Sequence, residues 1–484
     1  MTSETCAAYS GGTDRSFSPR WALAGLSLSI LLGALGTSSA NVALPTLAQD
    51  FGASFQQVQW IVLAYLLAIT TLIVSAGRLG DIIGRRRLLL AGIALFTLAS
   101  ILCGLAPSLS LLIAARALQG LGAGVMMTLA LAFVGETVPK ERTGSAMGLL
   151  GTMSAVGTAL GPSLGGVLIA GLGWRSIFLL MALIGGLNVL FAYRCLPAPQ
   201  QKVKSSANSF DSLGTLLLGL TLGAYALAMT VGHGHFDRFN AALLGAAVLG
   251  LCLFVLAEAR VASPLIRLTA FRDSVLSASL ATNVLVATVI TTTLLVPPFY
   301  LAHTLGLNAV AVGLVMSTGT VVSVLTGIPA GRIVDRFGTT SIVTFGLIQM
   351  AAGALALSVL PMMFGVVGYV VGVAIMAPGY QLFQAANNTA VMMNVSNDQR
   401  GVISGMLNLS RNLGLITGAS VMGALFAFAA GASDITAADP QAIATGMKIT
   451  FLVDAALIVV ALAIAVANHA FNTSKADQSA SAGR

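Results

Sequence analysis

Long uninterrupted apolar runs fill the chain from about residue 21 onward. A helix that spans a bilayer needs about 20 mostly apolar residues, and fourteen runs satisfy that requirement. They cover 21–48, 57–77, 87–106, 110–134, 144–170, 174–196, 211–231, 240–258, 274–299, 310–330, 341–360, 362–391, 400–428 and 447–468. Barrel strands are shorter and alternate polar with apolar positions. The pattern therefore predicts an all-α membrane protein with fourteen transmembrane helices.

The composition agrees with this pattern. Charged residues make up 8% of the 484 positions and hydrophobic residues 57%, with a mean hydropathy of +0.93. Soluble domains carry about 25% charged residues, so these few charges cannot cover a water-exposed surface. The composition excludes a soluble enzyme, a nucleic-acid-binding protein and a disordered scaffold.

The basic residues fall on alternate loops. With a cytoplasmic N-terminus, nineteen of the 24 Lys and Arg residues lie on the cytoplasmic side and only Arg175, Arg238 and Lys448 lie outside. Cytoplasmic loops of membrane proteins carry such an excess. We therefore predict a multi-pass protein of the cytoplasmic (inner) membrane with both termini in the cytoplasm. The net charge of +8 then reflects topology and implies no nucleic-acid partner.

A short motif occurs twice. Residues 77–84 and 331–338 both read Gly-Arg-aliphatic-x-Asp-x-x-Gly, each after an even-numbered predicted helix. Such repeated halves are a transporter architecture with the substrate site near the membrane midplane. The predicted order is a tail at 1–20, a six-helix bundle at 21–197, a linker at 198–210, two inserted helices at 211–258, a second, pseudo-symmetric six-helix bundle at 274–468 and a tail at 469–484.

The motif residues suggest turn chemistry. Gly77 and Gly84 permit a tight reversal between helices, and Asp81 can bond a helix N-terminus or a nearby arginine. Arg85 directly follows the first copy of the motif, and the second copy places equivalent residues at Gly331, Asp335 and Gly338.

Small residues form one face of the fifth predicted helix. Gly157, Gly161 and Gly165 are each four apart, which permits close helix packing. Pro162 in the same helix predicts a kink. Farther along, Pro297 and Pro298 are expected to break the ninth helix.

Three of these motifs together resemble the major facilitator superfamily, and within it the fourteen-helix drug:proton antiporters. They are residues 77–90, the Arg-x-x-Gln-Gly sequence at 116–120 and residues 151–166. The resemblance covers roughly residues 21–468. It implies export of small organic molecules such as drugs, antibiotics or metabolites by alternating access, with a proton gradient as energy source and no cofactor. It also implies that the repeated loop motif acts as a latch between the halves, although a simple turn remains the alternative.

Few ionisable residues lie inside the predicted spans, and such residues are functional candidates by default. They are Arg116, Arg411 and Asp454. In the family that the chain resembles, predicted helices 1, 4, 12 and 13 line a central cavity. The candidate substrate and coupling residues there are Ser38, Asn41, Arg116, Gln119, Gln381, Gln384, Asn387, Asn388, Asn408 and Arg411. Hydrogen bonding between helices is the alternative role for these side chains.

One position departs from the family pattern. Many cation exporters of this group carry an acidic residue in helix 1, and alignment on 41–45 places Gly36 there. Arginine does not release its proton in proteins, so the proton carrier stays open among Asp454, Asp81, Glu136 and the substrate itself. Two cations without a clear carboxylate partner need pairing, which predicts a preference for anionic or zwitterionic substrates.

Several alternatives remain open. The chain could be an uncoupled facilitator or a proton symporter of a small metabolite, or a membrane receptor or scaffold without transport. It contains no GxxxxGK[ST] motif for ATP and no nucleophile–base or metal-ligating cluster, so we predict neither an enzyme nor a metal site. We expect membrane lipids around a functional monomer.

Overall fold

The structure is a computed structural model that describes residues 19–137, 143–196, 212–231, 237–260, 273–393, 400–431 and 438–482. Regular structure in these ranges is entirely helical. Thirteen of the described helices are long and apolar enough to cross a membrane. The all-α membrane fold predicted from the apolar runs is therefore confirmed.

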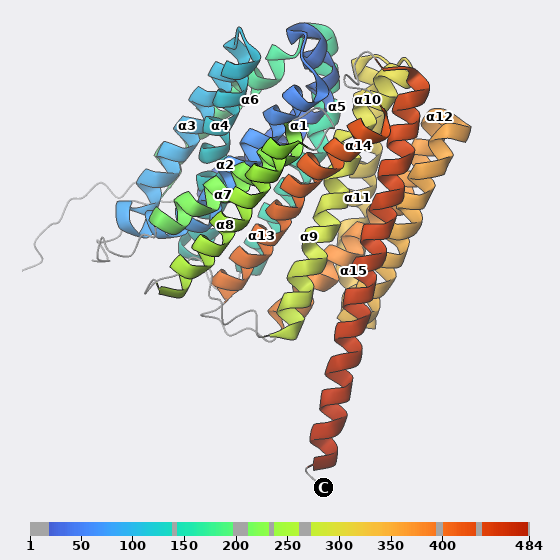
Figure 1. The fold of residues 1–484 in the computed structure, drawn as a ribbon. Coiled ribbons are helices and arrows are strands. Elements are labelled where there is room, and N and C mark those ends of the chain that lie inside the picture. Colours follow the sequence, from blue (N-terminus) through green and yellow to red (C-terminus); the bar gives the residue numbers. More distant parts are fainter. Residues whose placement is uncertain are drawn as a thin grey trace, which may run out of the picture.

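The helices form two bundles that lie side by side (Figure 1). The N-terminal bundle contains α1 (Pro19–Phe51), α2 (Phe55–Ile83), α3 (Arg85–Leu105), α4 (Leu109–Thr137), α5 (Thr143–Leu172) and α6 (Arg175–Cys195). Two further helices follow, α7 (Ser212–Thr230) and α8 (Arg238–Arg260). The C-terminal bundle contains α9 (Ser274–Leu295), α10 (Pro297–Phe299), the π-helix η4 (Tyr300–Thr304), α11 (Ala309–Phe337), α12 (Thr339–Met392), α13 (Arg400–Thr417), the π-helix η5 (Gly418–Met422), α14 (Gly423–Ala429) and α15 (Pro440–Ala482).

Helix α12 is a hairpin rather than one rod. Its 54 residues would extend about 80 Å as a straight helix, far beyond a hydrocarbon core of about 30 Å. Gly365 leaves the helical conformation with φ 54°, and Gly353 packs against the backbone of Met376. The two arms are the predicted spans 341–360 and 362–391. The total of fourteen crossings stays a prediction, because thirteen helices qualify and this hairpin is one of them.

The two copies of the repeated motif end in equivalent turns. Gly84 (φ 102°) joins α2 to α3, and Gly338 (φ 82°) joins α11 to α12. Glycine adopts positive φ without steric cost, so the predicted reversal is confirmed at these two positions. It is wrong for Gly77 and Gly331, which lie inside α2 and α11. The α-helix simply continues through the first half of each motif.

The structure describes only some of the other motif side chains. Asp335 is exposed on the last turn of α11, and Arg85 begins α3. The side chains of Asp81 and Glu136 lie outside the described part of the chain, so the latch remains a prediction. The end of the bundles that carries the Gly84 and Gly338 turns is named the Gly84 end. The opposite end, where α2 begins, is named the Phe55 end.

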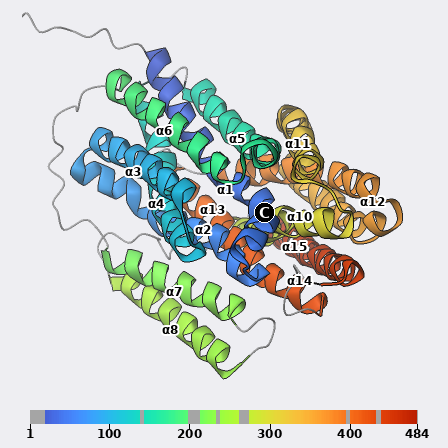
Figure 2. The same cartoon turned by 90° about the horizontal axis from the view of Figure 1, so that it is seen from above.

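The inserted helices α7 and α8 lie at the edge of the molecule (Figure 2). Trp60 Nε1 of α2 donates to Thr230 Oγ1 of α7 at 3.1 Å. From the same helix α7, the Tyr225 hydroxyl donates to Thr417 Oγ1 of α13 at 3.2 Å. The pair is therefore inserted between the bundles in sequence but peripheral in space, with α7 touching both.

Three predicted spans differ in detail. Helix α9 ends at Leu295, two residues before Pro297, and the short helices α10 and η4 continue the chain through and beyond the two prolines. The run 400–428 is α-helical at both ends but contains the π-helical turn η5. The last helix begins at Pro440 and continues through most of the residues expected to form the tail.

Candidate functional site

The N-terminal bundle encloses Arg116, whose side chain is 0% exposed. Its Nε donates to the Ile61 carbonyl at 3.0 Å, and Nη2 donates to the Gly36 carbonyl at 2.9 Å. Nη1 donates to Gln119 Oε1 at 2.6 Å. The guanidinium carbon Cζ also lies 4.1 Å from the Tyr65 ring centroid. Backbone dipoles, an amide and an aromatic face together stabilise the charge.

These contacts correct the expectation that Arg116 makes a central cavity positive. Each of its nitrogens donates to a partner inside the bundle, so this conformer needs no anion to balance the charge. Gln119 is equally buried and donates from Nε2 to Ser100 Oγ at 2.7 Å. The Arg-x-x-Gln pair thus ties α4 to α1, α2 and α3.

Tyr65 accounts for the glycine at the position of the missing carboxylate. A Cβ added to Gly36 would lie 2.6 Å from the Tyr65 hydroxyl, well inside van der Waals contact. The hydroxyl itself donates to the Gly33 carbonyl at 2.8 Å. The ring therefore fills the space that a side chain at position 36 would need, and the Gly36 carbonyl serves Arg116 instead.

The glycine face of α5 packs closely on a neighbouring helix, as predicted, and that helix is α1. Gly157 lies against the Leu31 backbone and Gly161 against Ser38, while Ser38 Oγ donates to the Gly157 carbonyl at 3.3 Å. Gly165 continues this contact one turn later. Ser38 therefore bonds within the helix interface and does not line a cavity. Pro162 lies inside α5 without ending it.

A second face of α5 joins the two bundles. Gly166 packs on the Ala309 carbonyl and on Gly313 of α11, and Gly313 in turn lies against the Pro162 carbonyl. Because neither glycine has a side chain, the two backbones touch directly. Gly166 belongs to the motif that resembles exporters, but its contact across the bundles was not predicted.

An aromatic cluster seals the bundles at the Phe55 end. Phe55 of α2 lies edge-on to Phe299 at 4.8 Å and to Phe426 of α14 at 5.6 Å between ring centroids. All three rings are fully buried. Among the described residues, every ring contact and close glycine contact between the bundles lies in the half toward this end.

Two buried glutamines lie beside this seal. Gln59 packs against Gly423 of α14, and Gln56 lies one turn earlier on α2. Neither side chain has a hydrogen-bond partner among the described residues. Neither was predicted from the sequence, although two amides three residues apart in an apolar helix are a readable signal. On α1, Asn41 Oδ1 is also buried without a described partner. The Asn41 Nδ2 donates to the Thr37 carbonyl at 3.2 Å.

The C-terminal bundle carries its own polar interior. Asn283 of α9 donates to the Leu407 carbonyl at 3.0 Å and to Ser410 Oγ at 2.8 Å on α13. Farther along α9, Thr292 Oγ1 lies within hydrogen-bond distance of Asp454 Oδ1 of α15, at 3.2 Å. Asp454 is 0% exposed and its Oδ2 has no partner among the described residues. Most of α15 is peripheral, and the face that carries Asp454 is buried against α9.

The remaining candidate residues lie on α12 and α13 and differ in burial. Gln381, Gln384, Asn408 and Arg411 are half-buried, Asn388 is exposed and Asn387 is buried. Asn387 Nδ2 donates to the Ser279 carbonyl at 3.5 Å, inside the C-terminal bundle and away from the other bundle. Arg411 makes no hydrogen bond or ion pair with a described residue, so it is the intramembrane cation that stays available to a ligand.

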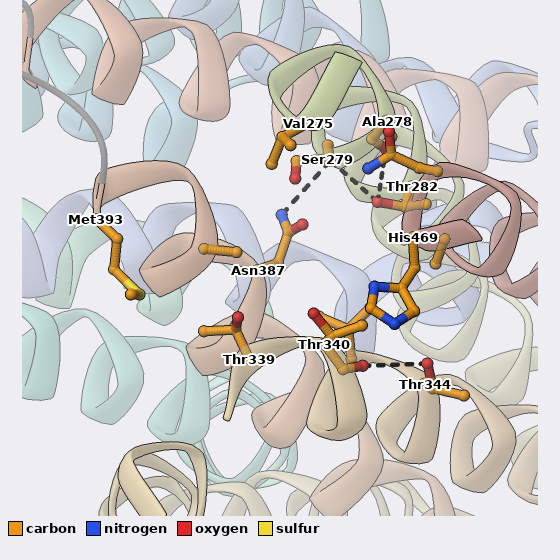
Figure 3. Close-up of a pocket in the computed structure, with 14 residues that line it drawn as sticks. Val275, Ala278, Ser279, Thr282, Thr339, Thr340, Thr344, Asn387, Met393 and His469 are labelled. Carbon is orange, nitrogen blue, oxygen red and sulfur yellow. Dashed lines mark hydrogen bonds between the residues drawn. The ribbon is translucent and has the colours of Figure 1, made fainter. Parts of the chain in front are cut away.

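A hollow of about 280 Å³ lies inside the C-terminal bundle near its Gly84 end (Figure 3). Helices α9, α12 and α15 line it. Its polar side chains are mainly hydroxyls and amides, with one imidazole and no carboxylate: Ser279, Thr282, Thr339, Thr340, Thr344, Asn387, Asn468 and His469.

Comparison with known proteins agrees with this geometry. The profile of the Major Facilitator Superfamily matches residues 26–419 and 278–481. The chain belongs to the major facilitator superfamily. It is 33% identical over 390 residues to the multidrug resistance protein Stp of Mycobacterium tuberculosis, covering 80% of this chain and 72% of that protein. It is 29% identical over 410 residues to the riboflavin transporter RibZ of Clostridioides difficile, covering 83% and 86%.

The fold comparison points the same way. A crystal structure of a bacterial homologue of the human lysosomal transporter Spinster superposes with a TM-score of 0.65, at 16% identity, covering 96% of this chain and 99% of that one. The chain is therefore a transporter of this superfamily, as the motifs predicted, with relatives in multidrug resistance, and its substrates are small molecules.

Proposed function

We propose that this transporter exports small organic molecules across the cytoplasmic membrane in exchange for protons, by alternating access between its two bundles. The observation that carries the proposal is the seal at the Phe55 end. Phe55, Phe299 and Phe426 close one face of the interface between the bundles, and no equivalent contact is found among the described residues at the Gly84 end. Closure at one end only is what one conformer of an alternating-access cycle requires.

The loop charges and the relatives support the direction. The positive-inside pattern favours a cytoplasmic Gly84 end, and we infer that the conformer described here is open to the cytoplasm. The multidrug resistance protein among the relatives supports export of a drug-like or antibiotic-like molecule.

The substrate preference now depends on Arg411 alone. Arg116 is fully paired inside its bundle, whereas Arg411 makes no hydrogen bond with a described residue. We therefore retain the preference for anionic or zwitterionic substrates and assign it to α13. Arg411→Gln should raise the KM for anionic substrates about tenfold, the equivalent of about 1.4 kcal/mol. Arg411→Lys, which keeps the charge, should change it less.

A substrate screen tests the function. The chain is expressed in an efflux-deficient host, and resistance to a panel of anionic, zwitterionic and cationic compounds is measured with and without a proton uncoupler. We expect resistance to anionic or zwitterionic compounds that the uncoupler abolishes. Strong efflux of cationic dyes that does not depend on Arg411 would contradict the substrate preference.

A metabolite facilitator or symporter is the second candidate. Position 36, acidic in many cation exporters, is glycine here and is sterically closed by Tyr65, and one relative is a riboflavin transporter. Flux into proteoliposomes with and without an imposed pH gradient separates the candidates. Substrate flux that does not change with the pH gradient indicates a facilitator. Substrate flux driven in the same direction as the protons indicates a symporter.

A further inference from the structure

We infer that the proton-binding site of this transporter is Asp454, inside the C-terminal bundle, and that its protonation holds the aromatic seal closed through helix α9. The inference deepens the proposed proton exchange and rests on it. It locates the proton site away from the interface where the substrate passes.

The first support is the isolation of the Asp454 carboxyl group. The side chain is 0% exposed, one oxygen contacts Thr292 and the other has no partner among the described residues. No other acidic residue lies within the described helices α9, α12, α13, α14 and α15, apart from Asp477 at the far end of α15. An acidic group this deep in a membrane protein is costly unless it is paired, neutral or in use.

The other described elements packed against α15 contain no lysine or arginine to pair with Asp454. Helices α9 and α14 contain no titratable residue, and α12 contains only Tyr369 and Tyr380. The π-helix η4 contributes His303, which contacts the Phe299 carbonyl at 3.3 Å, and Tyr300, whose hydroxyl donates to the Pro361 carbonyl. On α15 itself the nearest charged residue is Lys448, about 9 Å along the helix toward the Phe55 end.

The Thr292 hydroxyl can form one more hydrogen bond with the neutral Asp454 carboxyl group than with the carboxylate. Its oxygen lies 3.2 Å from Asp454 Oδ1 and 3.2 Å from the Thr288 carbonyl. A hydroxyl has one hydrogen and can donate it to only one acceptor at a time. Both contacts are hydrogen bonds at once only if Thr292 donates to Thr288 and a protonated Asp454 donates to Thr292. The neutral acid therefore suits the closed seal.

Helix α9 connects the carboxyl group to the seal. Thr292 of α9 precedes Phe299 of the adjoining α10 by seven residues, about 10 Å at the rise of a helix, and Phe299 packs edge-on against Phe55 of the other bundle. When Asp454 loses its proton to water, the hydrogen bond to Thr292 is replaced by a buried negative charge that needs hydration. Opening the α9–α15 contact supplies water and carries Phe299 away from Phe55.

Closure of the seal by a bound proton is the direction of coupling that proton exchange requires. A proton taken up at the Phe55 end closes that end, and its release toward the Gly84 end permits the return. The hollow lined by Thr282 of α9 and Ala465 of α15 lies on the same two helices, about 15 Å from the carboxyl group. Buried Ile458 and Ala461 lie between them on α15, so release toward the hollow requires these side chains to move apart.

The test measures the seal directly and needs no substrate. Nitroxide labels are placed at Leu172 of α5 and Phe428 of α14, which are 77% and 70% exposed at the Phe55 end of the two bundles. The native cysteines are replaced by alanine, and label distances are measured in lipid nanodiscs from acidic to alkaline pH. In the parent chain we expect the ratio of long to short distances to rise with pH, by up to about tenfold per unit, the limit for one linked proton.

The variants separate Asp454 from the other groups. Asp454→Asn should keep the short distance at every pH, and Thr292→Val should move the opening to lower pH because it removes the acceptor that stabilises the closed form. Asp439→Asn is the matched control, since Asp439 caps the same helix at its exposed end and asparagine caps equally well. It should behave like the parent.

Two results would overturn the inference. One is a distance ratio that does not change with pH in the parent chain. The other is a pH response that persists in Asp454→Asn and disappears in His303→Gln, which would assign the response to the imidazole at the seal. Failure of proton-dependent efflux alone would contradict the proposed function but would leave a pH response that depends on Asp454 intact.

Discussion

Among the described residues, Arg116 of the N-terminal bundle and Asp454 of the C-terminal bundle are both fully buried, and their surroundings are opposite. Arg116 has an acceptor for each of its three nitrogens and an aromatic ring beside it. Asp454 has one hydrogen bond and one oxygen without a partner among the described residues. Burial alone therefore does not distinguish a structural charge from one that changes state. The number of satisfied partners does.

The largest expected effect is the difference in unfolding free energy between a variant that neutralises Arg116 and one that neutralises Asp454. Arg116→Met leaves the acceptors on Gly36, Ile61 and Gln119 unpaired in the membrane interior, so we expect unfolding to become easier by about 3–5 kcal/mol. Asp454→Asn removes no satisfied ionic contact and should change stability by about 1 kcal/mol or less. Thermal unfolding of both variants in detergent measures the difference. Equal losses would show that Asp454 is as structural as Arg116.

The glycine face of α5 gives the next largest effect. Gly161→Val places a side chain against Ser38 of α1 and should cost about 1–3 kcal/mol through overpacking. Gly151→Val is the matched control on the same helix, because nothing lies within 4 Å of an added Cβ there. The amount of folded protein in the membrane should fall for the first variant only. A similar loss for both would mean that helix propensity, and not contact with α1, decides.

The smallest effect concerns the position of the missing carboxylate. Gly36→Ala should destabilise the protein by about 1 kcal/mol, because its Cβ meets the Tyr65 hydroxyl. Tyr65→Phe alone loses one hydrogen bond to Gly33, which is worth about 1 kcal/mol. Together the two changes should cost less than their sum, since removing the hydroxyl relieves the collision. Strict additivity in a double-mutant cycle would separate Gly36 from Tyr65.

Apolar periodicity was sufficient to predict the architecture of the described chain. The runs predicted the helices, and the turns at Gly84 and Gly338 followed from a repeated motif in which only glycine suits the backbone. The face of Gly157, Gly161 and Gly165 could be read from spacing, because four-residue intervals return to the same side of a helix. These features depend on local geometry, which sequence encodes directly.

The partners of the charged groups could not be read in the same way. The acceptors for Arg116 include main-chain carbonyls of Ile61 and Gly36, and any residue type supplies a carbonyl. Which carbonyls face α4 depends on the rotation of α1 and α2. The partner of Asp454 depends on which face of α15 packs against α9, and the apolar run of that helix does not show its rotation. The two amides of Gln56 and Gln59 can be read from α2, but the contact of Gln59 with Gly423 of α14 cannot.

The peripheral position of α7 and α8 has a consequence for the speed of the cycle. Helix α7 is bonded to α2 and packs on α8, whose leucines and valines are largely exposed. Any rotation of the N-terminal bundle must therefore move α7 and α8 sideways through the acyl chains of the lipid. Friction with the surrounding lipid then contributes to the turnover rate of transport. The turnover rate should therefore be lower in a stiff, saturated bilayer than in a fluid one.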